Sequence, residues 1–427
     1  MEIIKYPVRA DWEKLTVRPS LDVTALFDTV RTVLHEVQQE GDAAVKRYGE
    51  KFDKVVLSSL LVTEDEFAEA EALVPEELKQ AIRIAKGNIE KFHASQRFTG
   101  EKVETTPGVT CWQKAVAIEK VGLYIPGGTA PLFSTVLMLA VPARIAGCKE
   151  IVLCTPPNRE GKVHPAILFA AKVAGVSKIV KAGGIQAIAA MTYGTASVPK
   201  VYKIFGPGNQ YVTAAKQLVS LKDVAIDMPA GPSEVQVIAD ETANPSFIAA
   251  DFLSQAEHGA DSQSILVTDC EALIPQVEKA IREQLEQLPR KEITEKSLVN
   301  SRIILLKDQQ EIIDFTNEYA PEHLIIQTRD YREMAEKIEN AGSVFMGAFT
   351  PESAGDYASG TNHTLPTNGY AKAYSGVNLD SFIKKITFQE VTADGMKELG
   401  ETIRVMAANE QLEAHRNAVT VRLNSLP

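Results

Sequence analysis

The chain has 427 residues, 24% of them charged, and its formal net charge is −11 at pH 7. This length exceeds what one hydrophobic core usually supports, so we expect two or more domains. The acidic balance disfavours nucleic acid or an anionic membrane surface as a partner, and no apolar run reaches the roughly 18 residues of a membrane span.

Residues 1–20 are expected to form a short arm, and no basic stretch followed by an apolar core indicates an export signal there. The four cysteines are widely spaced and match neither a zinc ribbon nor a redox motif, so we expect reduced thiols and a cytoplasmic protein. Apolar residues recur at helical spacing from about 22 to 52 and from 76 to 98, which predicts helices.

From residue 119 to 232, strand-like and helix-like segments alternate, which predicts right-handed βαβ units and a parallel sheet. The strand-like segments are 121–125, 150–154, 178–181, 201–205 and 224–228, and the helix-like segments are 132–146, 164–174, 185–193 and 209–218. Three strand-to-helix turns are rich in glycine: 126–131, 182–187 and 206–211. Each alone is more simply a tight turn, since none is a full GxGxxG motif, but together they indicate a nucleotide site of unusual form.

A second α/β unit follows, with strand-like segments at 233–239, 264–268, 302–306, 323–327 and 343–346. Helix-like segments at 245–258, 272–288, 309–318 and 331–340 separate them, and a last helix is predicted at about 395–413. The predicted fold is therefore α/β, with two Rossmann-like, doubly wound parallel-sheet domains and helical N-terminal and C-terminal extensions. The expected division is an arm 1–20, a first domain 21–118 plus 233–375, a second domain 119–232 and a tail 376–427.

The segment 351–367 is unusually polar and contains Asp356 and His363, each of which could ligate a metal or transfer a proton. Gly355, Gly360 and two prolines argue against a stable helix, and the absence of alternating apolar residues argues against a strand. A polar loop of this length is either functional or simply a solvated surface loop, and the segment alone does not favour one of these.

Gln255 and His258 lie at the end of the predicted helix 245–258, on the face that Ile248 and Phe252 mark as buried. Buried polar side chains need partners. A hydrogen-bonded core pair is the simpler interpretation, and a pair of metal ligands is the alternative.

Glu322 and His323 stand where a predicted helix gives way to the strand 323–327, because Pro321 disfavours helix at the residue before it. In a regular strand the two side chains would point to opposite faces, so they can share a site only at the mouth of the strand. There they could form a general-base pair. Glu410 and His415 are five residues apart, so they can act together only if the last helix ends between them.

Seven motifs occur in one order along nearly the whole chain: YIPGGTAPLFST, FGPGN, DMPAGPSEV, LSQAEHGADSQ, APEHL, SAGDYASGTNHTLPT and AHRNAV. This combination closely resembles the histidinol dehydrogenase family. The resemblance implies oxidation of L-histidinol to L-histidine through the aldehyde, with one Zn²⁺ per subunit and two NAD⁺, in histidine biosynthesis. It also implies a homodimer whose active sites are completed by the tail of the partner subunit.

The resemblance further implies roles for individual residues. The implied zinc ligands are Gln255, His258, Asp356 and His415, and the implied acid–base pair is Glu322 and His323. The implied substrate contacts are Ser233, Gln255, His258, His323, Asp356, His363, Glu410 and His415. Tyr124, Gln186 and Asn209 match NAD-contacting positions, each in or beside a glycine-bearing turn.

Two other functions fit parts of the pattern. A metal-assisted hydrolase would use Glu322 to activate a zinc-bound water, but it has no use for the glycine-rich turns. A nucleotide-binding protein without catalysis is disfavoured by the intact set of Glu, His and metal-ligating residues.

Overall fold

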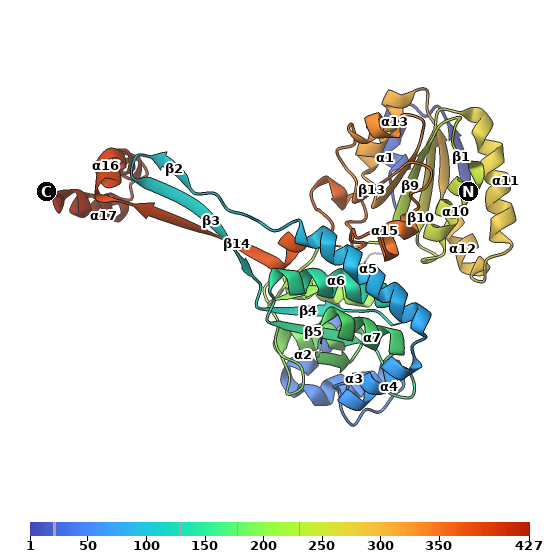
Figure 1. Cartoon of the computed structure of the whole chain (residues 1–427), viewed down its shortest axis with the longest axis horizontal. Helices are drawn as coiled ribbons and strands as arrows, with labels where there is room; N and C mark the ends of the chain where they lie inside the picture. The colour runs from blue at the N-terminus through green and yellow to red at the C-terminus, as the bar shows by residue number, and fades with distance from the viewer. Residues whose placement is uncertain (20–22, 128–129, 177, 230) are drawn as a thin grey trace.

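The computed structural model describes residues 1–19, 23–127, 130–176, 178–229 and 231–427. Gly128 and Thr129 of the predicted turn 126–131, and Asp22 at the start of the first helical pattern, lie outside the described residues. Within the described part, the strands form two parallel sheets and one antiparallel sheet, with helices around the parallel ones (Figure 1). The predicted fold class is therefore confirmed.

The larger parallel sheet, called the large sheet below, has the strand order β1-β11-β10-β9-β12-β13. Its strands are β1 (Glu2–Lys5), β11 (Arg302–Leu305), β10 (Gln263–Thr268), β9 (Glu234–Ala239), β12 (His323–Gln327) and β13 (Ser343–Met346). Its helices are α1 (Trp12–Leu15), α10 (Pro245–Ala256), α11 (Ile274–Leu285), α12 (Lys291–Leu298), α13 (Gln309–Tyr319) and α14 (Tyr331–Ala335). Val237 and its neighbours on one face share a hydrophobic cluster with α10 and α11, and Ile238 on the other face clusters with α13 and Trp12. Both faces are covered, as in a doubly wound sheet.

The smaller parallel sheet, called the small sheet below, has the strand order β6-β5-β4-β7-β8. Its strands are β4 (Lys120–Tyr124), β5 (Glu150–Thr155), β6 (Lys178–Lys181), β7 (Lys203–Phe205) and β8 (Ala225–Ile226). The helices that connect them are α6 (Phe133–Ala146), α7 (Pro165–Ala174), α8 (Gly184–Tyr193) and α9 (Gln210–Ser220). These bounds lie close to the predicted segments, because short apolar strands and capped helices leave clear local signals.

The N-terminal helices pack on the small sheet. They are α2 (Phe27–Glu40), α3 (Asp42–Asp53), α4 (Glu64–Leu73) and α5 (Glu76–Ala94). Buried residues of α2 and α3 cluster with one face of the small sheet, and those of α4 and α5 cluster with the other face. The expected grouping of 21–118 with 233–375 therefore differs from the observed packing. A helix shows in its sequence that one face is buried, but not which sheet buries it.

The N-terminal segment 1–20 also differs from the expected arm. Glu2–Lys5 is the edge strand β1 of the large sheet and pairs in parallel with β11. The four residues EIIK are too few for a periodic signal, and the pairing partner lies about 300 residues away in the sequence.

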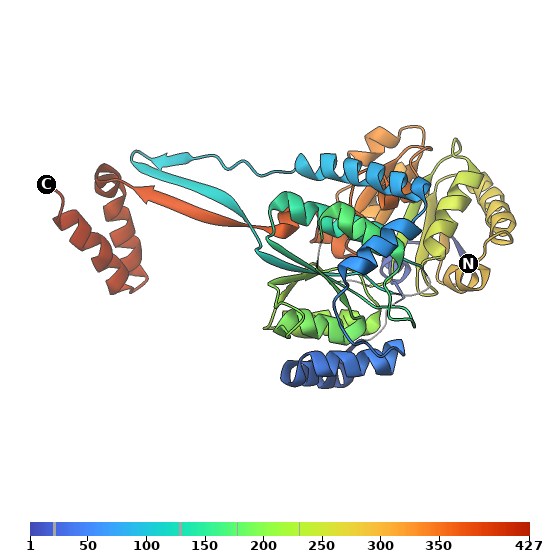
Figure 2. The same ribbon diagram turned by 60° about the horizontal axis from the view of Figure 1, so that its bottom comes forward.

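An antiparallel sheet extends away from both parallel sheets and carries the C-terminal helices (Figures 1 and 2). We call this unit the arm; its elements are β2 (Val103–Thr106), β3 (Val109–Ala117), β14 (Ile383–Val391), α16 (Ala393–Asn409) and α17 (Glu413–Asn424). Strand β14 pairs with β3 from Ile383↔Ala117 to Val391↔Val109. The break between α16 and α17 falls between Glu410 and His415, where the sequence analysis required it. The arm strands themselves were not predicted.

Short 3-10 helices complete the chain: η1 (Arg9–Asp11), η2 (Val23–Leu26), η3 (Glu271–Leu273), η4 (Tyr370–Lys372) and η5 (Leu379–Phe382). Among the helices that the structure describes, none has the length and apolar character needed to cross a membrane.

Candidate active site

Most of the predicted site residues gather where the carboxyl end of the small sheet faces the amino end of the large sheet. Tyr124 is the last residue of β4, and Gly206 directly follows β7. On the other side, Ser233 directly precedes β9 and His323 is the first residue of β12. Ligands of open α/β sheets usually bind at the carboxyl ends of the strands. The small sheet follows this rule, and the large sheet contributes its opposite edge.

A cleft of about 710 Å³ lies between these two edges. The predicted site residues in its lining are Asn209, Ser233, His258, Glu322, His323, Asp356 and His363. The small sheet contributes Thr135 of α6 and the turn at Gly206. Residues that are far apart in the sequence thus share one cavity.

Glu322 and His323 lie at the mouth of β12, as the sequence predicts. The preceding helix α13 ends at Tyr319, and Ala320 takes a left-handed conformation with φ of 53°. This turn lets both side chains face one site, and Nδ1 of His323 lies 3.6 Å from Oε2 of Glu322. Both residues are buried.

The backbone of Glu234, the first residue of β9, contacts both members of this pair. Its N–H donates a hydrogen bond to Oε2 of Glu322 at 3.0 Å. Its carbonyl oxygen lies 3.2 Å from Nδ1 of His323, which must be the donor in this contact. The other ring nitrogen, Nε2, faces Oδ1 of Asp356 at 3.7 Å, which is longer than a hydrogen bond.

Burial raises the pKa of Glu322 to about 7, because a carboxylate loses hydration in the closed cleft. Burial lowers the pKa of His323, but the carboxylates of Glu352, Glu322 and Asp356 outweigh this and raise it well above the ordinary value. A carboxyl group that titrates near neutral pH is suited to act as a general base.

The polar segment 351–367 contains a short helix, α15 (Glu352–Tyr357), although the sequence argues against one there. The prediction treated Gly355 as a helix breaker. A Cβ at Gly355 would lie 2.7 Å from Cε1 of Phe345, so the glycine permits close packing of α15 on β13. Glu352 and Asp356 are then four residues apart on one helix and point to the same side.

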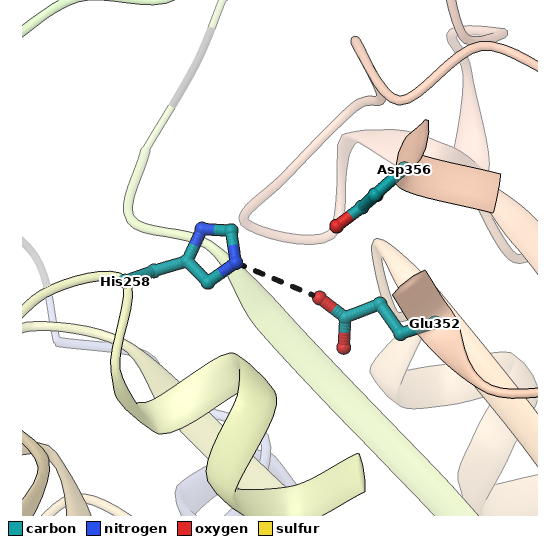
Figure 3. Close-up of side chains that lie close together, drawn as sticks. All are labelled: His258, Glu352 and Asp356. Carbon is teal, nitrogen blue, oxygen red and sulfur yellow. Dashed lines mark ion pairs between the residues drawn. The ribbon is translucent and has the colours of Figure 1, made fainter. Parts of the chain in front are cut away.

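Glu352, Asp356 and His258 form a cluster that could hold a metal ion (Figure 3). One ligand atom from each lies within 4.8 Å of the others. Nε2 of His258 is 3.9 Å from Oε1 of Glu352, and Oε1 of Glu352 is also 3.9 Å from Nδ1 of His323. Glu352 was missed in the sequence; its spacing of four from Asp356 would have revealed it, had α15 been predicted.

The donors of this cluster fit a divalent cation. Gln255 is fully buried on α10, and among the described residues neither of its amide atoms has a hydrogen-bond partner. Both carboxylate oxygens of Glu352 are likewise buried without a hydrogen-bond partner in the described part of the chain. Unpaired buried polar atoms are costly. Carboxylate, imidazole and amide oxygen donors suit zinc and related ions, and a bound cation would give a partner to the carboxylate oxygens of Glu352 and to the amide oxygen of Gln255, but not to the amide NH2, which is a donor.

The same burial shifts the pKa values of the titratable groups in this cluster. Burial raises the pKa of Glu352 and lowers that of His258. For Asp356, burial would raise the pKa, but the neighbouring imidazoles, His323 foremost, lower it overall. Asp356 is therefore ionised and His258 neutral at neutral pH, which are the states in which both bind a metal.

His363 links the two sides of the cleft. Its Nδ1 lies 2.9 Å from the carbonyl oxygen of Asp356, and its Nε2 lies 3.1 Å from Oγ1 of Thr135 on α6. Ser233 is half-buried in the cleft wall directly before β9. Both predicted substrate contacts therefore lie in the same cavity as Glu322 and His323.

A second cavity of about 950 Å³ is lined by all three residues that the sequence analysis assigned to NAD: Tyr124, Gln186 and Asn209. Oε1 of Gln186 is buried and has no hydrogen-bond partner among the described residues. Asn209 caps α9 through its side chain and also lines the first cleft. The two cavities are therefore adjacent.

Glu410 and His415 lie in the arm, at the far end from both parallel sheets (Figure 2). Both are exposed. Within one chain, the structure does not bring them to the cleft that contains the other predicted site residues.

A family model described as histidinol dehydrogenase matches residues 16–423 of the chain. A histidinol dehydrogenase from Bacteroides thetaiotaomicron is 69% identical over 426 residues, covering 100% of both chains. One from Escherichia coli strain K12 is 51% identical over 416 residues, covering 97% of this chain and 95% of the relative. The crystal structure of histidinol dehydrogenase from Elizabethkingia anophelis has a TM-score of 0.98 at 56% identity, covering 100% of this chain and 98% of that one.

Proposed function

The chain belongs to the histidinol dehydrogenase family of oxidoreductases, and we propose that it oxidises L-histidinol to L-histidine through L-histidinal with Zn²⁺ and two NAD⁺. These are the last two steps of histidine biosynthesis. The observation that carries this proposal is the meeting of a buried Glu–His pair, a metal-type donor cluster and an adjacent cavity of about 950 Å³ at one cleft. A hydrolase would need only the first two.

Gln255, His258 and Asp356 are the zinc ligands that we propose from this chain. The unpaired amide of Gln255 and the short distances between His258, Glu352 and Asp356 support this set. When bound, zinc would fix the substrate through its imidazole and amine nitrogens and would offset the carboxylate charge around His323. Glu352 adds a carboxylate next to these ligands.

His323 is the proposed base of the first oxidation. Its Nδ1 is tied to the carbonyl oxygen of Glu234, so Nε2 is the atom available to take the hydroxyl proton. As the O–H bond breaks, a hydride leaves the carbinol carbon for NAD⁺, and the alcohol becomes an aldehyde. The closed cleft keeps this reactive aldehyde away from other nucleophiles.

Glu322 is the proposed base that activates water for addition to the aldehyde. Its pKa of about 7 suits this task, because the group is both a competent base and partly ionised near neutral pH. As water adds, Glu322 takes the proton that leaves water, and the protonated His323 returns its proton to the aldehyde oxygen. The hydrate then loses a hydride to a second NAD⁺ and a hydroxyl proton to His323, which yields the carboxylic acid. One pair of side chains thus serves both oxidations.

Ser233 and His363 are proposed substrate contacts, and their place in the lining of the first cleft supports this. Tyr124, Gln186 and Asn209 are proposed to bind NAD. The buried, unpaired carbonyl oxygen of Gln186 supports a polar ligand in the second cavity. Gly206 allows the turn after β7 to lie close to Tyr124, because a Cβ at this position would be 2.0 Å from the carbonyl oxygen of Tyr124.

We further propose a homodimer in which Glu410 and His415 complete the site of the partner subunit. The arm carries both residues away from their own cleft (Figure 1). Its exposed apolar side chains, such as Phe388, Met406 and Val421, support a protein partner for the arm. The segment 376–427 does not form its own core: β14 pairs with β3, and the helices pack on each other.

Co-refolding of two variants that each fail to convert histidinol to histidine tests this assembly, with histidine formation as the measured activity. In a mixed dimer of Glu322→Gln and His415→Asn chains, shared sites would place both changes in one site and neither in the other, so activity should return. If each chain completes its own site, confirmed mixed dimers would stay inactive.

The direct test of the function is to incubate the purified protein with L-histidinol and NAD⁺ and follow NADH absorbance before and after chelation. Two NADH per histidinol, and loss of activity on chelation that added zinc reverses, are expected. Absence of NADH formation with zinc-loaded protein would refute the proposal. A cytoplasmic location, a division of the chain into two α/β domains, and a dimerisation role for the C-terminal tail 376–427 also stay proposals.

A further inference from the structure

The side chain of Glu234, whose backbone contacts both Glu322 and His323, is held by an arginine from the N-terminal segment. Nε and Nη2 of Arg18 donate to Oε2 and Oε1 of Glu234 at 2.7 and 2.8 Å. Both side chains are buried, at 8% and 1% exposure. Two parallel hydrogen bonds between a guanidinium and a carboxylate fix direction as well as distance. The carboxylate of Glu234 is thus tied to a residue 216 positions earlier in the chain.

Arg18 also contacts the segment that leads to the acid–base pair. Its guanidinium lies over the ring of Tyr319 at 3.7 Å from the centroid, and it donates to the carbonyl oxygens of Tyr319 and Ala320. Tyr319 is the last residue of α13 and Ala320 is its C-cap, two residues before Glu322. Arg18 therefore connects the start of β9 with the turn that precedes β12.

The backbone of Glu234 contacts one side-chain atom of Glu322 and one of His323, so its position affects both side chains. The N–H of Glu234 fixes one oxygen of Glu322, and the carbonyl oxygen of Glu234 requires a proton on Nδ1 of His323. In the neutral ring Nε2 is then free of a proton. A small displacement of this backbone would turn Glu322 and remove the contact that selects the tautomer of His323.

A second arginine attaches the same N-terminal segment without touching the pair. Nη1 of Arg302 donates to the carbonyl oxygen of Leu15 at 2.5 Å. Attachment of the segment and support of Glu234 are thus separate contacts, which separate variants can remove.

We propose that Arg18 is a positioning residue for the reaction: by fixing the carboxylate of Glu234, it holds the backbone that orients Glu322 and sets the tautomer of His323. Arg18 has this role only if Glu322 and His323 act as proposed above. A lysine would keep the charge but not the two parallel bonds, because its ammonium is a single point donor.

The test compares Arg18→Lys, the double variant Arg18→Met with Glu234→Leu, and the control Arg302→Met. The double variant removes both charges, so no unpaired charge stays buried to unfold the chain. We expect kcat with histidinol to fall roughly tenfold to hundredfold in the double variant, and less in Arg18→Lys, because small misplacements of catalytic groups have effects of this size. KM for histidinol and the zinc content should stay within about twofold of the wild-type values, since the proposed binding residues are unchanged.

A primary isotope effect with histidinol deuterated at the carbinol carbon should increase in both Arg18 variants, because hydride transfer becomes slower relative to product release. A wild-type kcat in Arg18→Lys, or an equal loss of kcat in Arg302→Met, would show that Arg18 only attaches the segment. Loss of zinc with unchanged kcat per bound zinc would refute the inference as well. If the wild-type chain does not oxidise histidinol, the proposed function itself fails, which is a different result.

Discussion

The substitution Glu322→Gln should stabilise the metal-free protein while it damages catalysis. Glu322 is buried, and its pKa is about 7 in the folded chain against 4.5 for an ordinary glutamate. Between these values the unfolded carboxyl group is ionised while the folded one keeps its proton. The folded state therefore binds more protons, and its free energy of unfolding falls as the pH rises from about 4.5 to about 7. Glutamine does not ionise and avoids this loss.

The size of the effect follows from the two pKa values. At ~1.4 kcal/mol per pKa unit, the wild-type chain loses about 3 kcal/mol relative to the glutamine variant across this range. Below about pH 4.5 both forms are neutral and the difference should be small, apart from the hydrogen bond of the Glu234 N–H, which the amide oxygen of glutamine can also accept. Above about pH 7 the difference should be constant.

Denaturant unfolding of both chains in the presence of a chelator, at about pH 5 and at about pH 8, measures this difference. Glu71→Gln is the control of opposite sign. Its carboxylate is exposed, and the pKa is lowered because Nζ of Lys172 donates to it at 2.7 Å. Relative to the wild-type chain, the Glu71→Gln variant should therefore not become more stable as the pH rises. A difference between wild type and Glu322→Gln that is the same at both pH values would refute the reasoning.

The remaining predictions concern catalysis and binding. His323→Asn should slow oxidation of histidinol by roughly 10²–10⁴-fold, whereas Glu322→Gln should spare histidinal formation more than histidine formation; single-turnover assays with each substrate separate them, and equal losses on both would contradict the assignment. Asp356→Asn should lose most of its bound zinc, and Glu352→Gln should weaken zinc binding by roughly 10-fold or more if its carboxylate supports the ligands; elemental analysis measures both, and full zinc content in both would contradict the proposed site. Gln186→Leu should raise KM for NAD⁺ by roughly 10-fold, as expected for one buried hydrogen bond, with little change in KM for histidinol; an unchanged KM for NAD⁺ would remove Gln186 from the proposed cofactor site.

Much of the fold is encoded locally. The strands β12 and β13 were predicted to the residue, because short apolar runs with breakers on both sides leave a strong signal. The position of Glu322 and His323 at the mouth of a strand was also predicted from the local sequence, because Pro321 disfavours helix at the residue before it. The resemblance of the long motifs to one family supplied what single residues could not, namely which of them belong together.

One prediction from the sequence was wrong in the segment 351–367, which contains a helix. Gly355 suggested that the polar segment contains no helix, yet it lets α15 pack against Phe345. The helix then brings Glu352 into the cluster, and its spacing of four from Asp356 marks it as a site residue only once that helix is known. Propensity is a weak guide wherever tertiary packing supplies the stabilisation.

The sequence by itself determined the alternation of strands and helices, the two parallel sheets and the chemical types at the site. Only the tertiary structure decided that the carboxyl edge of one sheet meets the amino edge of the other, that 27–94 packs on the small sheet, and that Arg18 reaches Glu234. It also decided that the arm carries α17, which contains His415, away from both parallel sheets (Figure 2). The physical reason is the range of the interactions: periodicity and turn chemistry act over a few neighbouring residues, whereas these contacts join segments up to about 300 residues apart and depend on which buried surfaces fit one another.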